Sequence, residues 1–231
     1  MNAVIYFSCT GHTKAVAKIA AEKLGFELTE LDLKTQNEIL ARDYSTAVVV
    51  FPVHCQSYPE FMKNFFRRIK SERVALIAVY GGADAGNALF EAAKLISATI
   101  VAAAYIPVGH SYLGDGFVPE ELPRELLDKI CTPAAVTVKR RGKTPFAGFL
   151  PSLRSRILVK IKRTEKCVGC NICGNECPMG AIERGITNAK CVRCLKCIKN
   201  CPEGALKVKK AKILTRYLNK THNADLILYL E

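Results

Sequence analysis

The chain has 231 residues, of which 49% are hydrophobic and 24% charged, and this composition indicates a folded globular protein rather than a disordered one. Its formal net charge is +13, and no apolar run reaches the roughly 18 uncharged residues that a membrane-spanning helix needs. The sequence begins with a strand-like run that no basic segment or cleavage site precedes, so we expect a cytoplasmic rather than a secreted protein.

The first part of the chain alternates apolar strands with helical patterns. The expected strands are Ala3–Phe7, Glu27–Leu31, Ala47–Val53, Val74–Tyr80 and Ile100–Val108. The expected helices are Thr13–Leu24, Glu60–Lys70, Gly86–Ser97 and Glu120–Ile130. Several strands are continuous Val/Ile/Ala runs, which is typical of strands buried on both faces of a parallel sheet. The alternation predicts an α/β fold with an open, doubly wound sheet, whose ligands bind beyond the carboxyl ends of the strands.

The loop after the first expected strand has the composition of a phosphate-binding loop. It reads Ser8-Cys9-Thr10-Gly11-His12-Thr13 and joins a strand to the start of a helix, where backbone N–H groups favour an anion. It lacks the Lys-Ser/Thr ending of a nucleoside-triphosphate loop and the G-x-G-x-x-G of a dinucleotide loop. The alternative interpretation is an ordinary helix start capped by Ser or Thr.

The pattern Ser8-x-Thr10-Gly11-x-Thr13 resembles the loop of flavodoxins that binds the phosphate of FMN. The resemblance implies a five-stranded sheet of order 2-1-3-4-5 and FMN contacts in the loops after the third and fourth strands. The candidate FMN contacts include the six loop residues Ser8, Cys9, Thr10, Gly11, His12 and Thr13. The later loops add Pro52, Val53, His54, Cys55, Gln56, Tyr58, Tyr80, Gly81, Gly82, Asp84, Gly86 and Asn87. The chain departs from flavodoxins in having no Trp and no acidic surface.

Single side chains in these loops have competing interpretations. Tyr58 is a candidate for stacking on the flavin ring, and His54 for donating a proton or hydrogen bond beside it; both are weak catalytic candidates. A loop histidine is also ordinary polar surface, and Asp84 is either a ring-side acceptor or a helix cap. Cys9 and Cys55 lie near the expected flavin, although small buried cysteines are usually inert.

Eight of the 11 cysteines form a duplicated motif near the C-terminus. Cys167-x2-Cys170-x2-Cys173-x3-Cys177-Pro recurs as Cys191-x2-Cys194-x2-Cys197-x3-Cys201-Pro, and each copy continues with Gly-Ala. This spacing is that of bacterial ferredoxins with two [4Fe–4S] clusters, in which the fourth cysteine of each run binds the other cluster. The predicted ligands of cluster I are Cys167, Cys170, Cys173 and Cys201. Those of cluster II are Cys191, Cys194, Cys197 and Cys177.

Two other uses of the cysteines are weaker. Structural zinc sites usually use separated pairs and often include His, which neither motif contains. A disulfide framework requires an oxidising compartment and does not need the doubled spacing.

The positive charge is concentrated between and within the cysteine motifs. We expect a flavodoxin-like domain at 1–138, a basic connector at 139–163, a two-cluster ferredoxin domain of α+β type at 164–212 and a C-terminal extension at 213–231. The connector holds Lys139-Arg140-Arg141 and an amphipathic stretch, Leu153–Lys162. It is a packed linker, a docking surface for an acidic redox protein, or a membrane-surface or nucleic-acid contact; no nucleic-acid motif supports the last. In the extension we expect a helix followed by a short strand, Leu226–Leu230, that docks on the body.

The order of these parts resembles the flavodoxin–ferredoxin fusion ("ferrodoxin") family common in anaerobes. The resemblance implies an electron-transfer flavo-iron–sulfur protein that passes electrons between two [4Fe–4S] clusters, FMN and a redox partner. The alternatives are an FMN-dependent reductase of a small organic substrate and a redox-sensing interaction protein.

Overall fold

The computed structural model of the chain describes residues 1–33, 35–113, 116–142, 151–219 and 224–231. A six-stranded sheet forms the larger part, in the order β10-β5-β4-β3-β1-β2. Its strands are β1 (Asn2–Tyr6), β2 (Glu27–Glu30), β3 (Asp43–Pro52), β4 (Lys70–Tyr80), β5 (Thr99–Pro107) and β10 (Ile227–Tyr229). The first five are parallel and follow the predicted order 2-1-3-4-5. The sixth, β10, pairs antiparallel with β5 and extends the sheet beyond the five strands expected.

Helices cover both faces of the sheet, as the alternating pattern predicts. The helices of this part are α1 (His12–Leu24), α2 (Gln36–Leu40), α3 (Met62–Arg68), α4 (Ala88–Ala93) and α5 (Arg124–Ile130). Helices α1 and α5 pack on one face over Val48 and Val50, whereas α2, α3 and α4 pack on the other over Val49 and Phe51. Alternate residues of a central strand thus enter opposite core layers, which explains why β3 is apolar without interruption from Ala47 to Pro52.

Helix boundaries differ from the expected ones where backbone geometry intervenes. Helix α5 begins at Arg124 rather than near residue 120, because Pro123 stands at its N-cap with an extended ψ of 131°. Helix α4 begins after Gly86, whose φ of +57° is incompatible with a helix. Helix α2 was not expected, since five residues are too few to show a helical period.

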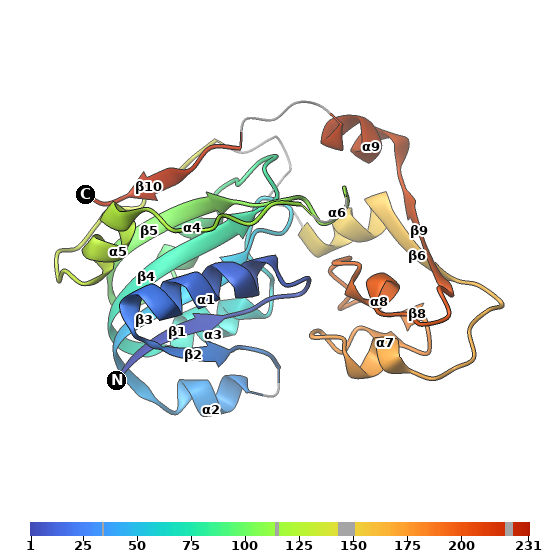
Figure 1. Ribbon diagram of the computed structural model, residues 1–231, viewed down its shortest axis with the longest axis horizontal. Coiled ribbons are helices and arrows are strands. Elements are labelled where there is room, and N and C mark those ends of the chain that lie inside the picture. The colour runs from blue at the N-terminus through green and yellow to red at the C-terminus, as the bar shows by residue number, and fades with distance from the viewer. Residues whose placement is uncertain (34, 114–115, 143–150, 220–223) are drawn as a thin grey trace.

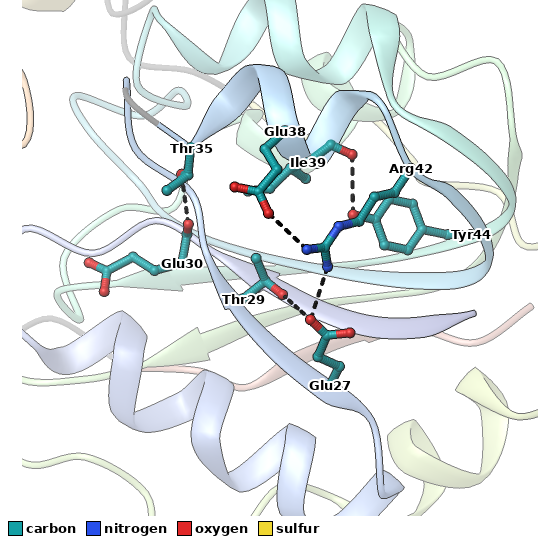
Figure 2. A network of polar contacts seen from close by, with 8 residues as sticks. All are labelled: Glu27, Thr29, Glu30, Thr35, Glu38, Ile39, Arg42 and Tyr44. Carbon is teal, nitrogen blue, oxygen red and sulfur yellow. Dashed lines mark hydrogen bonds and ion pairs between the residues drawn. The ribbon is translucent and has the colours of Figure 1, made fainter.

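A network of polar contacts fixes α2 against the sheet edge (Figure 2). Arg42 bonds Glu27 of β2 at 3.0 Å and Glu38 of α2 at 2.9 Å, and the Tyr44 hydroxyl donates to the Ile39 carbonyl at 3.2 Å. The two carboxylates raise the pKa of Arg42. Because these ion pairs are exposed, they orient α2 rather than provide most of its stability, which comes from the burial of Ile39 and Leu40.

The cysteine-rich part forms a second, smaller unit beside the sheet (Figure 1). Its elements are α6 (Pro151–Leu158), β6 (Val159–Arg163), α7 (Ile172–Asn175), β7 (Ile182–Glu183), β8 (Ile186–Thr187), α8 (Lys196–Lys199), β9 (Leu206–Lys210) and α9 (Lys212–Leu218). Strand β6 pairs antiparallel with β9, and β7 with β8. The amphipathic stretch Leu153–Lys162 is divided, because the chain leaves the helix after Leu158 and enters β6.

The C-terminal segment returns from α9 to the sheet, as the sequence predicts. Strand β10 lies along β5, far from the cysteine-rich unit that precedes it in the chain (Figure 1). The Tyr80 hydroxyl donates to the Asp225 carbonyl at 2.6 Å, and the Tyr229 ring packs edge-on against Tyr105 with centroids 6.5 Å apart. Pairing with β10 covers the edge of β5 that would otherwise expose unpaired backbone groups.

Among the described residues, none belongs to a helix that is both long and apolar enough to cross a membrane.

Candidate functional site

The loop between β1 and α1 leaves the N-terminus of α1 open. Gly11 is the N-cap, with a φ of +98° that a side chain would disfavour, and it makes no side-chain cap. The Gly11 N–H donates to Ser8 Oγ at 3.1 Å, which folds the loop under the helix. No acidic residue lies in the first turn. The Ser/Thr-capped alternative is therefore wrong, and the N-terminus of α1, which carries partial positive charge, has no side-chain cap.

The loop after β3 contains a strained turn. His54 and Ser57 exchange backbone hydrogen bonds of 2.7 and 3.0 Å, and the two residues between them, Cys55 and Gln56, have φ values of +50° and +68°. Two consecutive left-handed residues define a type I′ turn, which normally takes Asn and Gly. Each non-glycine residue in this conformation costs about 1–2 kcal/mol, so packing around the turn must hold it.

The loop after β4 provides that packing. A Cβ at Gly86 would lie 2.3 Å from the Gln56 carbonyl oxygen, so only glycine allows the two loops to approach so closely. The Asn87 N–H donates to the Gln56 carbonyl at 3.2 Å. Asp84 accepts hydrogen bonds from Gln56 Nε2 and, at 2.8 Å, from the Gly86 N–H. Asp84 thus joins the two loops and is not a helix cap; the N-cap of α4 is Asn87.

These loops line a cavity of about 610 Å³ that also reaches the cysteine-rich unit. Twelve of the 18 candidate flavin contacts line it: Cys9, Thr10, His12, Thr13, Pro52, Val53, His54, Cys55, Gln56, Tyr80, Gly81 and Asp84. The other six, Ser8, Gly11, Tyr58, Gly82, Gly86 and Asn87, are not among its lining residues. Three of these instead contact other loop residues. Ser8 Oγ accepts a hydrogen bond from the Gly11 N–H, Gly86 packs closely against Gln56, and the Asn87 N–H bonds the Gln56 carbonyl.

Sequence reasoning missed the rest of the cavity wall. The loop after β5 contributes residues 108–112, and the cysteine-rich unit and its flanking helices contribute Ser155, Ile157, Leu158, Val192, Arg193, Cys194, Ile213, Leu214, Tyr217 and Leu218. The position of residues 108–112 at the carboxyl end of a parallel strand was a usable signal, because loops at that edge converge. No local pattern could have indicated the contributions of α6 and α9.

The two aromatic candidates have different environments. The Tyr58 ring packs edge-on against Phe66 of α3, with centroids 5.2 Å apart, and does not line the cavity. His54 lines the cavity, and its buried Nδ1 has no hydrogen-bond partner among the residues that the structure describes. Burial lowers the pKa of His54 from 6.5 to about 4, so the ring is neutral near pH 7.

A second cavity contains the four predicted ligands of cluster II. Cys177 from the first motif and Cys191, Cys194 and Cys197 from the second line it together with apolar residues that include Ile161 and Met179. Cys194 also lines the larger cavity, so the two cavities share a wall. None of the 11 cysteines is in a disulfide. Within the described residues, no three His, Cys, Asp or Glu side chains converge closely enough to hold a single metal ion.

The two cysteine motifs have nearly the same backbone. Asn171 and Leu195, each one residue after the second cysteine, have φ values of +59° and +67° and begin α7 and α8. After the fourth cysteine, the N–H groups of Ala181 and Ala205 each lie 3.3 Å from the sulfur of Cys177 and Cys201, respectively. Such backbone donors to sulfur are expected beside thiolate ligands.

Direct contacts join the two units at the shared wall. The Cys9 thiol, in the loop before α1, hydrogen-bonds the Cys194 side chain. The Tyr112 hydroxyl donates to the Arg193 carbonyl at 2.8 Å, and Lys210 Nζ donates to the Tyr112 carbonyl at 3.0 Å. The bond to Cys194, together with burial, raises the pKa of Cys9, whereas the same bond lowers the pKa of Cys194 to about 7.

Comparison with known proteins addresses both units. Residues 139–220 match the family of 4Fe-4S dicluster domains. Among solved structures, the chain is similar to the two-electron reduced flavodoxin of Megasphaera elsdenii, with 16% identity over 56% of this chain and 95% of that one and a TM-score of 0.40. It is also similar to the Trp repressor binding protein of Bacillus subtilis, with 18% identity, the same coverage and a TM-score of 0.35.

A third similar structure is the NAD(P)H:quinone oxidoreductase of Methanothermobacter marburgensis, with 14% identity over 41% of this chain and 74% of that one and a TM-score of 0.30. Among curated proteins, none is similar enough to count as a match. The chain thus joins a flavodoxin-like sheet to a segment that matches 4Fe-4S dicluster domains, in the order that the sequence predicts.

We predict that Gly86→Ala destabilises the sheet unit more than Gly25→Ala. Both glycines have a left-handed φ, +57° and +67°, but a Cβ at Gly25 meets nothing within 4 Å. Gly25→Ala should cost about 1–2 kcal/mol of unfolding free energy, and Gly86→Ala roughly 3 kcal/mol or more because it also clashes with Gln56. Chemical denaturation followed by tyrosine fluorescence measures both; equal losses would show that the loops do not depend on this contact.

We also predict that His54 makes the free energy of unfolding fall as the pH is lowered. A neutral buried histidine with a folded pKa of about 4 against 6.5 unfolded stabilises the fold fully above pH 6.5, and this contribution is lost as the pH falls toward 4. Between pH 7 and 5 the wild type should lose about 2 kcal/mol more unfolding free energy than His54→Gln. Denaturation without added flavin at both pH values tests this, and parallel losses in the two proteins would contradict it.

Proposed function

We propose that this chain is an electron-transfer protein that holds one FMN and two [4Fe–4S] clusters and exchanges electrons with a redox partner. The observation that carries the proposal is the shared wall formed by Cys194. One cavity beside this wall gathers the flavodoxin-like loops, and the other is lined by four cysteines of the two sequence motifs. FMN and the clusters supply one-electron carriers to this arrangement.

The larger cavity fits a flavin phosphate and ring. The open N-terminus of α1, with Thr10, His12 and Thr13 on the cavity wall, suits the phosphate. The buried Nδ1 of His54 and two buried nitrogens of Arg193 have no partner within the described residues, so a ligand with acceptor groups would satisfy them. Pro52–Gln56 and Tyr80–Gly81 would flank the ring, although Tyr58 would not stack on it.

The cysteine cavity fits the predicted crossed ligation. Cys177 of the first motif lies with three cysteines of the second, as cluster II requires. The matching backbone of the two motifs supports the same arrangement for Cys167, Cys170, Cys173 and Cys201 around cluster I. A four-iron cluster spreads its thiolates farther apart than one metal ion does, which suits side chains that do not converge on a single point.

Helices α6 and α9 cover the larger cavity with apolar side chains. Leu158, Leu214 and Leu218 line it from the side of the cysteine-rich unit. These side chains would restrict the access of water and of large partners to a bound flavin. Electrons would therefore reach the flavin site through the cluster II site, with which it shares the Cys194 wall, and an external protein would dock on the cysteine-rich unit.

The β6–β9 sheet offers a surface for such a partner. Lys160 lies directly opposite Lys209, and Lys162 opposite Lys207, and all four side chains are exposed. Like charges directly opposite each other destabilise a strand pair. Within the described part of the chain, none of the four forms an ion pair with an acidic side chain. Ile161, between two of these lysines, lines the cluster II cavity, so we propose that an acidic redox protein docks on this face.

The first test is the composition of protein purified without oxygen. We expect about eight iron atoms, with matching acid-labile sulfide, and one FMN per chain, because two four-iron clusters and one flavin account for all the sites. Iron and sulfide assays, flavin extraction and the visible spectrum measure this. Full iron content without flavin, even after reconstitution, would show that the larger cavity is not a flavin site. About four iron atoms per chain would show that the protein holds one cluster rather than two.

Cys9→Ala should make cluster II harder to reduce. A hydrogen bond to a ligand sulfur stabilises the added negative charge, and losing one of about 0.5–1.5 kcal/mol lowers a one-electron potential by roughly 20–65 mV. Anaerobic redox titration followed by electron paramagnetic resonance measures the change. Cys131→Ala, at an exposed cysteine, is the control. Equal potentials in both variants would contradict a Cys9–Cys194 bond in the loaded protein.

Reversing charge on the lysine face should slow electron transfer with an acidic ferredoxin. We expect Lys160→Glu with Lys209→Glu to lower the second-order rate roughly tenfold at low salt, an effect that fades as salt rises. The same change in net charge on α1, Lys18→Glu with Lys23→Glu, is the control. Stopped-flow mixing at several salt concentrations measures the rates, and equal slowing by both pairs would place the docking surface elsewhere.

A further inference from the structure

Arg193 is a buried cation that the fold of the cysteine-rich unit leaves partly unpaired. It lies between Cys191 and Cys194, is 8% exposed and lines the larger cavity. Its side chain hydrogen-bonds the Cys191 thiol, but its Nε and Nη1 have no hydrogen-bond partner within the described part of the chain. Buried guanidinium N–H groups without acceptors are costly, so an acceptor is expected from whatever fills the cavity.

The duplicated motif shows that the backbone does not need arginine at this position. The equivalent residue of the first motif is Gly169, with a φ of +76°, and Arg193 has a φ of +59°. Glycine adopts this conformation freely, whereas arginine is strained in it. Because glycine satisfies the same turn in the first motif, the arginine side chain must serve something other than the turn.

The surroundings of Arg193 favour an anionic ligand. The open N-terminus of α1 borders the same cavity and has no acidic residue in its first turn. The carboxylate among the described lining residues is Asp84, whose oxygens already accept hydrogen bonds from Gln56 and Gly86. Two separate sources of positive charge thus face one apolar-walled space, where electrostatic interactions are strong.

We propose that the Arg193 guanidinium binds an anionic group of the FMN in this cavity, so that the cysteine-rich unit completes the flavin site. The inference rests on the proposed function. FMN offers two such groups: its phosphate, and the pyrimidine side of its ring, which gains negative charge on reduction. Arg193 would also place one side chain in contact with both the flavin and Cys191, a predicted ligand of cluster II.

The test compares the affinities of FMN and riboflavin, which lacks the phosphate, for the full chain with its clusters in place. Quenching of flavin fluorescence under anaerobic conditions gives both dissociation constants. Arg193→Gly copies the first motif, and Arg193→Gln removes the charge while keeping a long side chain. Arg184→Gly is the control, since Arg184 is an exposed arginine with a φ of +43° that does not line the cavity. Iron content shows whether each variant retains its clusters. If the glycine variant loses iron, the FMN affinity of the glutamine variant gives the result.

We expect both Arg193 variants to bind FMN roughly 10- to 100-fold more weakly than the wild type, the usual range for a charged hydrogen bond, and Arg184→Gly to bind it normally. An equal loss for riboflavin would assign the contact to the ring, and an unchanged riboflavin affinity would assign it to the phosphate. An FMN affinity within about twofold of the wild type in a variant with full iron would overturn the proposal. If the wild type itself binds no FMN, the proposed function fails instead.

Discussion

The packing of the second cysteine motif against the loop before α1 is the constraint on which the rest of the site depends. Cys9 belongs to the loop that shapes the N-terminus of α1, and its hydrogen bond reaches Cys194 in the other unit. One hydrogen bond contributes only about 1 kcal/mol net. The polar contacts of Cys9 and Tyr112 instead fix how the units are aligned.

Backbone strain is concentrated around the two cavities. Among the described residues, six other than glycine have a positive φ: Cys55, Gln56, Asn171, Arg184, Arg193 and Leu195. Five of them border a cavity or begin a helix of the cysteine motifs, and only Arg184 lies in an exposed hairpin turn. Conformations of this kind persist only where neighbouring contacts impose them. The contacts of Gly86 and Asn87 with Gln56 show how one flavodoxin-like loop imposes its shape on the next.

The sequence predicts the periodic parts of this protein well and the long-range parts poorly. The order of the five parallel strands follows from buried apolar runs and from the resemblance of one loop, and the cysteine motifs carry their own spacing. Loop composition indicates where a ligand site could lie but not which side chains face it. Tyr58, a candidate for stacking on the ring, packs on Phe66. The contributions of α6, α9 and Tyr112 depend on contacts between residues far apart in the chain. Arg193 did leave a signal, because it breaks the symmetry of the repeat at Gly169.

Joining the two units in one chain keeps their contacts together. The hydrogen bonds between them include those of Tyr112 with Arg193 and Lys210, and side chains of both units line the larger cavity. A covalent connection raises the effective concentration of each unit beside the other to the millimolar range, so even a weak interface stays closed most of the time. The return of the chain from α9 to β10 adds a second connection, because β10 is part of the sheet. The cysteine-rich unit is therefore held at both ends, which limits how far the Cys194 wall can move away from the flavodoxin-like loops.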